Sequence, residues 1–176
     1  NNLVISPVKA LVNLPKLATL NLAHNKLSSL ADGAPAGHNA KTFIEWTVPE
    51  SIVSLDLSHN LIDGIMCPNG GSYAACTYKN GYLRNLQTLD MSNNPLLQGT
   101  LGEEDLTTMS SPVLKSMNFE NCDLSGALPD PGTNMQKTPI TINVKNNTKM
   151  TWGAGAALPG WVTQGGLKQA PGAKFS

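Results

Sequence analysis

One spacing of apolar and polar residues recurs along the chain, namely Leu-x-x-Leu-x-Leu-x-x-Asn-x-Leu, where x is mostly polar. Its central part alternates apolar and polar residues, which predicts a short strand with one buried face. Because no single coil can bury such a face alone, the repetition predicts stacked coils around one continuous core. Four good copies and a weaker fifth occur at 17–27, 52–62, 86–94, 114–124 and 142–147.

The asparagine or cysteine that closes each copy is expected to turn the chain inside its coil. A buried amide must be hydrogen-bonded, so we expect each Asn to bond the backbone of its own turn and of the next coil. A thiol is small and tolerates burial, so Cys122 is expected to be buried and free. This structural ladder consists of Asn25, Asn60, Asn94, Cys122 and Asn147.

The intervals between ladder residues are unequal. They are 35 and 34 residues up to Asn94, and then 28 and 25. Regular coils run about 20–29 residues, which predicts insertions of roughly ten residues near 31–50 and 66–85, on loops away from the strand face. These insertions hold much of the aromatic content, namely Phe43, Trp46, Tyr73, Tyr78 and Tyr82.

The repeat pattern resembles the leucine-rich repeat. The segment Leu124-Ser125-Gly126-Ala127-Leu128-Pro129 looks like the L-x-G-x-I-P segment of plant or algal extracellular repeats, and Leu97-Gln98-Gly99-Thr100-Leu101 is similar. The resemblance covers about residues 15–150. It implies an α/β solenoid, a horseshoe of about five irregular coils with a parallel β-sheet on the concave face and mostly loop or short helical returns. This fold hosts many functions, so it does not identify the ligand.

The composition changes near residue 150. The last 27 residues hold six Gly and two Pro, and their large side chains include Trp152 and Trp161. We therefore divide the chain into a leucine-rich-repeat domain over 1–150 and a Gly-rich C-terminal tail over 151–176. We interpret the tail as extended, covering the last coil or lying on a partner.

Composition and charge mainly exclude classes of function. The 23 Leu and 18 Asn make up about a quarter of the chain, and the repeat accounts for both. Twelve Lys and Arg balance twelve Asp and Glu, so no overall field would attract nucleic acid or an anionic membrane. No apolar run approaches about 18 residues, so we expect no membrane insertion.

The solvent side of the strands, the usual binding surface of a solenoid, is small and polar. It lacks the Trp, Tyr and Arg that favour interface hot spots. We interpret it as ladders that solvate the sheet, with a flat surface for carbohydrate or ice and ordinary protein contact as alternatives. Its columns are Thr19, Ser54, Thr88, Ser116 and Thr141, then Asn21, Asp56, Asp90, Asn118 and Asn143, and then Ala23, Ser58, Ser92, Glu120 and Lys145.

Two pairs in neighbouring coils are candidates for chemistry. Asp56 and Asp90 share a column, so a calcium ion between them is conceivable, but two carboxylates pointing into water are the simpler interpretation. His24 and His59 should stack, yet a zinc site needs three or four ligands. Since no catalytic constellation is present, we expect no enzyme, no cofactor and no metal.

Three residues bear on the compartment. Cys67 and Cys76 flank one inserted loop, and a disulfide between them would indicate an extracellular, secreted or other oxidising location. The alternative is two ordinary loop thiols. Asn146-Asn147-Thr148 is an acceptor triplet for glycosylation of Asn146.

These observations favour a non-catalytic protein–protein recognition or scaffold module. The aromatic residues of the insertions and tail are the ligand-contact candidates, because they offer more contact area than the strand face. A structural or accessory subunit of a larger multi-protein assembly is the alternative. Glycan or ice adsorption through the Thr/Ser strand face is a further one.

Overall fold

The computed structural model describes residues 14–28, 49–62, 64–66, 85–100, 113–128, 141–152, 162–163 and 168–169. All regular structure in these ranges is β-strand, so the short helical returns expected from the resemblance do not occur there. Within the same ranges, no helix is long and apolar enough to cross a membrane.

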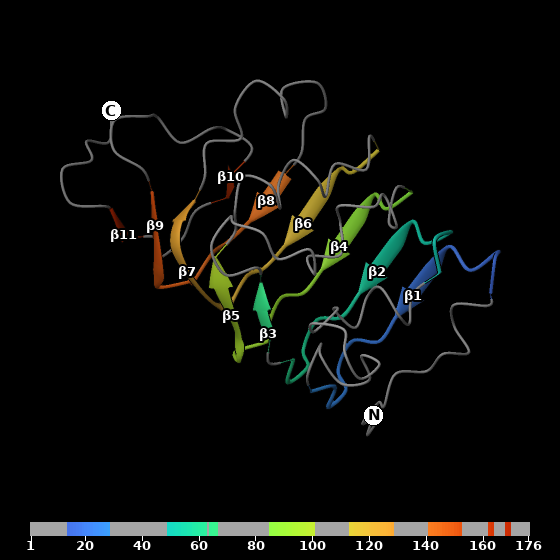
Figure 1. Cartoon of the computed structure of the whole chain (residues 1–176), viewed down its shortest axis with the longest axis horizontal. Helices are drawn as coiled ribbons and strands as arrows, with labels where there is room; N and C mark the ends of the chain where they lie inside the picture. The colour runs from blue at the N-terminus through green and yellow to red at the C-terminus, as the bar shows by residue number, and fades with distance from the viewer. Residues whose placement is uncertain are drawn as a thin grey trace, which may run out of the picture.

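The strand predicted at the centre of each repeat is present, and these strands form one parallel sheet (Figure 1). The apolar centres of the first five strands lie opposite one another, from Leu20 through Leu89 to Ile142. The predicted parallel sheet is therefore confirmed. In order across the sheet, its six strands are β1 (Thr19–Asn21), β2 (Ser54–Asp56), β4 (Thr88–Asp90), β6 (Ser116–Asn118), β8 (Thr141–Asn143) and β10 (Val162–Thr163).

A second parallel sheet occupies the return side of the coils, where the sequence predicted loop or helix. Its strands arise where the Leu-x-Gly segments lie side by side, and Met66, assigned above to an insertion, ends one of them. Gly126 has φ +81°, and a Cβ there would lie 2.8 Å from Thr100 Cγ2, so this segment requires glycine. The strands are β3 (Gly64–Met66), β5 (Leu97–Thr100), β7 (Asp123–Leu128), β9 (Lys149–Trp152) and β11 (Lys168–Gln169).

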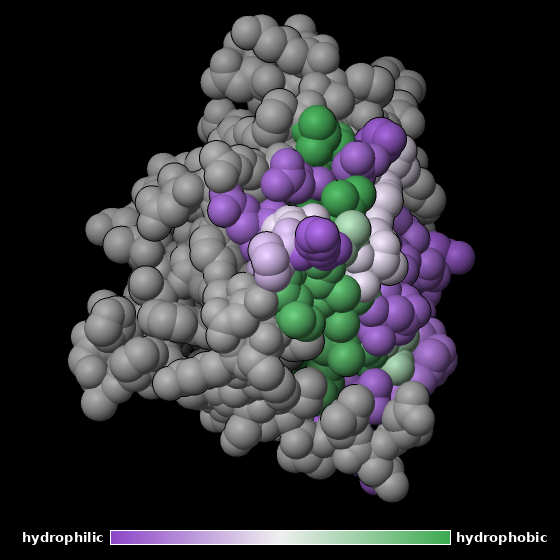
Figure 2. All heavy atoms as spheres, turned by 90° about the vertical axis from the view of Figure 1, so that its right-hand side faces the viewer, coloured by the Kyte–Doolittle hydropathy of each residue, from purple (hydrophilic) through white to green (hydrophobic). Residues whose placement is uncertain are grey.

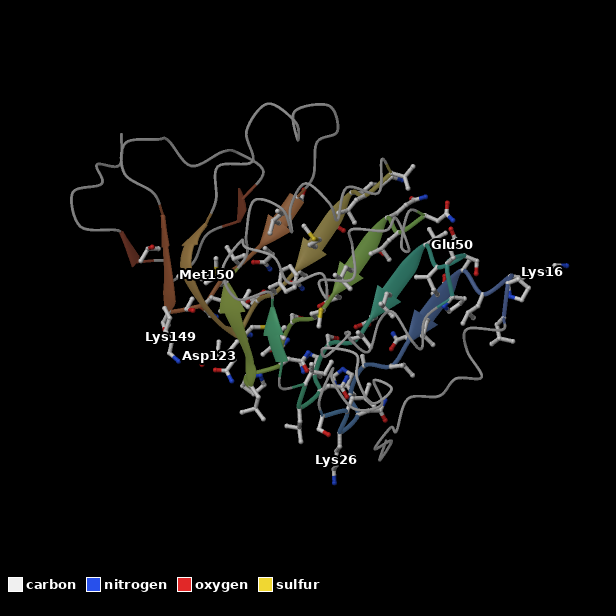
Figure 3. The ribbon with its side chains drawn as sticks, in the orientation of Figure 1. Lys16, Lys26, Glu50, Asp123, Lys149 and Met150 are labelled. Carbon is white, nitrogen blue, oxygen red and sulfur yellow. The ribbon has the colours of Figure 1, made fainter. Side chains whose placement is uncertain are left out.

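The apolar side chains of both sheets and of the ladder turns form one core cluster, as stacked coils require. Ile52, Leu57 and Phe119 are among its fully buried members. At the β1 end, Leu17, Leu20 and Leu22 pack against this core but are only partly buried. Figure 2 views the molecule from this end and shows hydrophobic residues gathered there.

The paired backbone continues beyond residue 150. Strand β9 runs through Trp152, β10 pairs with β8, and β11 pairs with β9. Both sheets therefore include residues from the segment that we assigned to the tail. The domain boundary itself stays a prediction.

Candidate interaction surface

The ladder asparagines join consecutive coils from inside. Asn60 Nδ2 donates at 3.0 Å to the carbonyl oxygens of Leu57 and Ser58 in its own turn and of Leu22 in the coil before it. Its Oδ1 accepts the backbone N–H of Leu27, also in the preceding coil, at 3.0 Å. The expectation of bonds to the next coil was therefore wrong in direction, because the amides of Asn60, Asn94 and Asn147 reach back to the preceding turn.

The length of each turn determines whether the next ladder residue has a backbone N–H to accept. After Asn60 and Cys122, an N–H two residues on, from Ile62 or Leu124, donates to the Oδ1 of the following ladder Asn. The turn after Asn94 is one residue longer, and there Leu97 N–H donates to the carbonyl oxygen of Asn94 itself, at 2.9 Å. The next ladder position therefore has no such N–H to accept, and that position is Cys122.

Cys122 is buried and free, as predicted. Its Sγ lies 3.3 Å from the carbonyl oxygen of Met91, to which the thiol donates. Burial raises the pKa of the thiol to about 11, the nearby Asp90 carboxylate adds to this, and a backbone hydrogen bond from Asn94 opposes it. The residue therefore acts as a neutral donor inside the core.

On the solvent side of the large sheet, the column between the strand leucines forms an amide–carboxylate row of Asn21, Asp56, Asp90, Asn118 and Asn143. Asn21 Nδ2 donates to Asp56 Oδ2, and Asn118 Nδ2 donates to Asp90 Oδ2, both at 3.0 Å. The two carboxylates lie side by side on β2 and β4. Each is thus held on its outer side by an amide.

The other oxygen of each of these side chains is also in use. Asp56 Oδ1 and Asp90 Oδ1 accept the backbone N–H two residues on, from Ser58 and Ser92, at 3.0 and 2.9 Å. The side-chain oxygens Oδ1 of Asn21 and Asn118 likewise accept the backbone N–H two residues on, from Ala23 and Glu120. The flanking amides therefore present N–H groups to the carboxylates, and their oxygens, which calcium would need, are engaged by backbone.

Three further contacts join side chains across the strand face. Thr88 Oγ1 donates to Ser54 Oγ at 2.8 Å. This bond links β4 to β2 within the hydroxyl column, the column of Thr and Ser side chains that begins at Thr19. At the other end, Asn143 Nδ2 donates to Glu120 Oε2 at 3.0 Å, and Lys145 Nζ lies 3.6 Å from Glu120 Oε1. The face is thus an ordered polar surface in which side chains bond across the strands.

The residue just before each ladder residue adopts positive φ, between 54° and 63°. We call this set the left-handed row; it consists of His24, His59, Asn93, Asn121 and Asn146. The predicted stacking of His24 on His59 is confirmed, with ring centroids 4.2 Å apart and planes 15° apart.

Hydrogen bonds continue this row in one direction. Asn146 Nδ2 donates to Asn121 Oδ1 at 2.6 Å, and Asn121 Nδ2 donates to Asn93 Oδ1 at 2.8 Å. Asn93 Nδ2 then lies 3.2 Å from His59 Nε2, which accepts when it carries no proton. The sequence did not predict this link, although the recurrence of Asn and His, which tolerate positive φ, was a signal for it.

Several candidate residues lie outside the described residues. Trp152 ends β9 beside Leu128 and Gln169 in register, but its side chain is not described. Within the described ranges, no group of three or more His, Cys, Asp or Glu could hold a metal ion. The candidates outside are Phe43, Trp46, Tyr73, Tyr78, Tyr82 and Trp161, with the disulfide candidates Cys67 and Cys76.

The comparison with known families agrees with this repeat geometry. The family model described as Leucine Rich Repeat matches residues 85–109, which include β4, the Asn94 turn and β5. This match supports a leucine-rich repeat protein. Parallel sheets without helices in the described ranges fit a solenoid-like repeat fold. No curated protein matches the chain.

Leucine-rich repeats typically mediate protein–protein interaction and are generally non-catalytic. On the strand face, the carboxylates of Asp56 and Asp90 are half-buried and held by hydrogen bonds. Neither Asp56 nor Asp90 forms an ion pair with a described residue. The carboxylates of Asp56 and Asp90 can therefore accept hydrogen bonds from donors on another surface.

Proposed function

We propose that this protein is a non-catalytic recognition module that binds another protein, in an extracellular or other oxidising compartment. The observation that carries the proposal is the amide–carboxylate row, in which neighbouring strands hold Asp56 and Asp90 in register between Asn21 and Asn118. The horseshoe of about five coils, with this sheet on its concave face, is part of the same proposal.

Order in the unbound state supports binding by this face. Each carboxylate is fixed by a side-chain amide and by a backbone N–H. Side chains that are already immobilised lose little conformational entropy when a partner arrives. Lys or Arg side chains on the partner suit the paired carboxylates.

The aromatic residues of the insertions and tail remain the proposed anchors for the partner, in addition to the strand face. Tyr and Trp supply large contact areas and dominate interface hot spots. In this proposal the strand face provides polar specificity and the aromatic residues provide most of the affinity.

Substitution of Thr88 by tyrosine tests the face directly. Thr88 is half-buried on β4, next to the carboxylate pair, and a tyrosine there would obstruct contact. The matched control is Gln98→Tyr, at an exposed position of β5 on the other sheet. We expect Thr88→Tyr to abolish affinity capture of the native partner and Gln98→Tyr to retain it. Equal capture by both variants contradicts the role of the face.

A structural subunit of a larger assembly is the second candidate. The partly buried Leu17, Leu20 and Leu22 at the β1 end favour it, because an apolar end of a stack suits another packed surface. A free monomer in size-exclusion chromatography counts against it.

Glycan or ice adsorption through the hydroxyl column is a further alternative. Unchanged thermal hysteresis and glycan-array binding in Thr88→Tyr would end it.

The compartment has its own test. A Cys67–Cys76 disulfide predicts that the intact mass of the native protein rises by two hydrogens on reduction. A mass that does not change on reduction contradicts the disulfide, and with it the observation from which the oxidising location is argued.

A further inference from the structure

We infer that Asn146 is an N-glycosylation site that carries an oligosaccharide at the turn that follows β8. The inference goes beyond protein binding and rests on the proposed compartment. Asn146-Asn147-Thr148 is the chain's single Asn-x-Ser/Thr triplet in which x is not proline. The described geometry explains how this fold accommodates a sugar there.

The two adjacent asparagines of the triplet differ completely in environment. Asn146 is exposed and has φ +63°, which turns its side chain away from the core. Asn147 is fully buried, and its Nδ2 donates to the carbonyl oxygens of Phe119, Val144 and Lys145. The residue that the triplet makes the acceptor is therefore the one with room for a sugar, and Thr148 is exposed as well.

The hydrogen bond made by Asn146 is compatible with modification. Its Nδ2 donates to Asn121 Oδ1 at 2.6 Å. A primary amide carries two N–H groups, and an N-glycosidic bond replaces one of them. The remaining N–H can still donate to Asn121, so glycosylation leaves the left-handed row continuous.

The transfer balances with a glycosyl donor of a defined class. The donor is an oligosaccharide held on a lipid pyrophosphate, and a transferase of the secretory lumen supplies the base. The Asn146 amide nitrogen forms a bond to the anomeric carbon as the bond from that carbon to the phosphate oxygen breaks. The lipid pyrophosphate leaves with the electron pair, and the base takes the proton from nitrogen.

A glycan at this position restricts where a partner can bind. Asn146 follows β8, whereas Asp56 and Asp90 lie on β2 and β4, with β6 between. Adjacent strands are about 4.8 Å apart, so two strand spacings, roughly 10 Å, separate β8 from β4. The attachment point of the sugar therefore lies two strands from Asp90 and three strands from Asp56.

The test is secretion of the chain behind a signal peptide from eukaryotic cells, followed by intact-mass measurement before and after treatment with an N-glycosidase. We expect a glycan on wild type, none on Thr148→Ala, and retention on Thr148→Ser, which keeps the hydroxyl. Because Thr148 is exposed, Thr148→Ala should fold, and thermal unfolding checks this. If it does not fold, wild type trimmed by the glycosidase provides the sugar-free sample.

Two results would overturn the inference. One is a folded, secreted wild-type chain without sugar at Asn146. The other is a native peptide that contains unmodified Asn146 and gains no ¹⁸O when glycosidase treatment is done in H₂¹⁸O. Capture of a partner by Thr148→Ala tests protein binding separately, so failure of one proposal is distinguishable from failure of the other.

Discussion

Two rows of side chains run across the same turns one residue apart, and they differ in burial and in the groups to which they bond. The ladder, with Asn60, Asn94 and Asn147, is buried and bonds to backbone. The left-handed row, with Asn93 and Asn146, bonds side chain to side chain at the surface. Both rows are rich in asparagine, so composition alone does not distinguish them.

The difference shows at which positions the repeat requires one kind of residue and at which it accepts several. A ladder amide satisfies backbone groups that have no access to water, so a substitution there leaves them unpaired. A residue of the left-handed row competes with water for its partners and must chiefly accept positive φ. Sequence variation between Asn and His is accordingly found in the outer row, whereas Cys122 enters the inner row only where a longer turn precedes it.

The largest expected effect comes from Asn94→Ala. Asn94 is fully buried, donates to Leu57 and Met91 carbonyl oxygens at 3.0 and 2.9 Å, and accepts Ile62 N–H at 3.1 Å. Loss of these bonds should lower the free energy of unfolding by about 4 kcal/mol, measured by urea denaturation.

The matched control for this change is Asn93→Gly. It keeps the backbone conformation of the neighbouring position and removes its side chain. We expect a loss of less than about 1 kcal/mol, because the bonds of Asn93 lie at the surface. Equal losses for the two variants would erase the distinction between the rows.

Cys122 should make the free energy of unfolding depend on pH in the alkaline range. Its folded-state pKa of about 11 lies above the ordinary value of 9.0, so the folded protein holds the thiol proton more tightly than the unfolded chain. Stability from this group is fully present below pH 9 and falls as the pH rises toward 11, by about 2–3 kcal/mol in total. The measurement is the difference in unfolding free energy between wild type and Cys122→Ser across that range. A constant difference contradicts the raised pKa.

The turn-length rule predicts a rescue. Deleting the exposed Pro95 shortens the turn to Asn94-Leu96-Leu97, which copies Asn60-Leu61-Ile62. Leu97 N–H then points to ladder position 122, where a thiol accepts poorly, and we expect a loss of about 2 kcal/mol.

Adding Cys122→Asn to the deletion should restore most of that stability, since the amide oxygen accepts this N–H as Asn94 accepts that of Ile62. The same substitution in the unshortened chain should not stabilise. A double-mutant cycle by urea denaturation measures the coupling, and additive effects would refute the rule.

The sequence predicted the large sheet because its apolar spacing is specific to the strand period, and it located the ladder because Asn and Cys recur at one offset. It did not predict the second sheet, since Leu97-Gln98-Gly99 and Leu124-Ser125-Gly126 are short and lack strand alternation. The direction of the ladder bonds and the link from Asn93 to Asn146 depend on three-dimensional register. The spacing of a single repeat does not encode that register.

The smallest expected effect concerns Asn121, in the middle of the left-handed row. Asn121 has φ +56°, donates to Asn93 and accepts from Asn146. Asn121→Gly removes both side-chain bonds but accepts the backbone conformation, whereas Asn121→Ala removes the same bonds and adds strain. We expect the glycine variant to lose about 0.5 kcal/mol and the alanine variant about 1–2 kcal/mol in thermal or urea unfolding. Because the lost contacts are identical, the gap between the variants isolates the cost of positive φ. If glycine proved as destabilising as alanine, the hydrogen bonds and not the backbone conformation would determine which residues this row accepts.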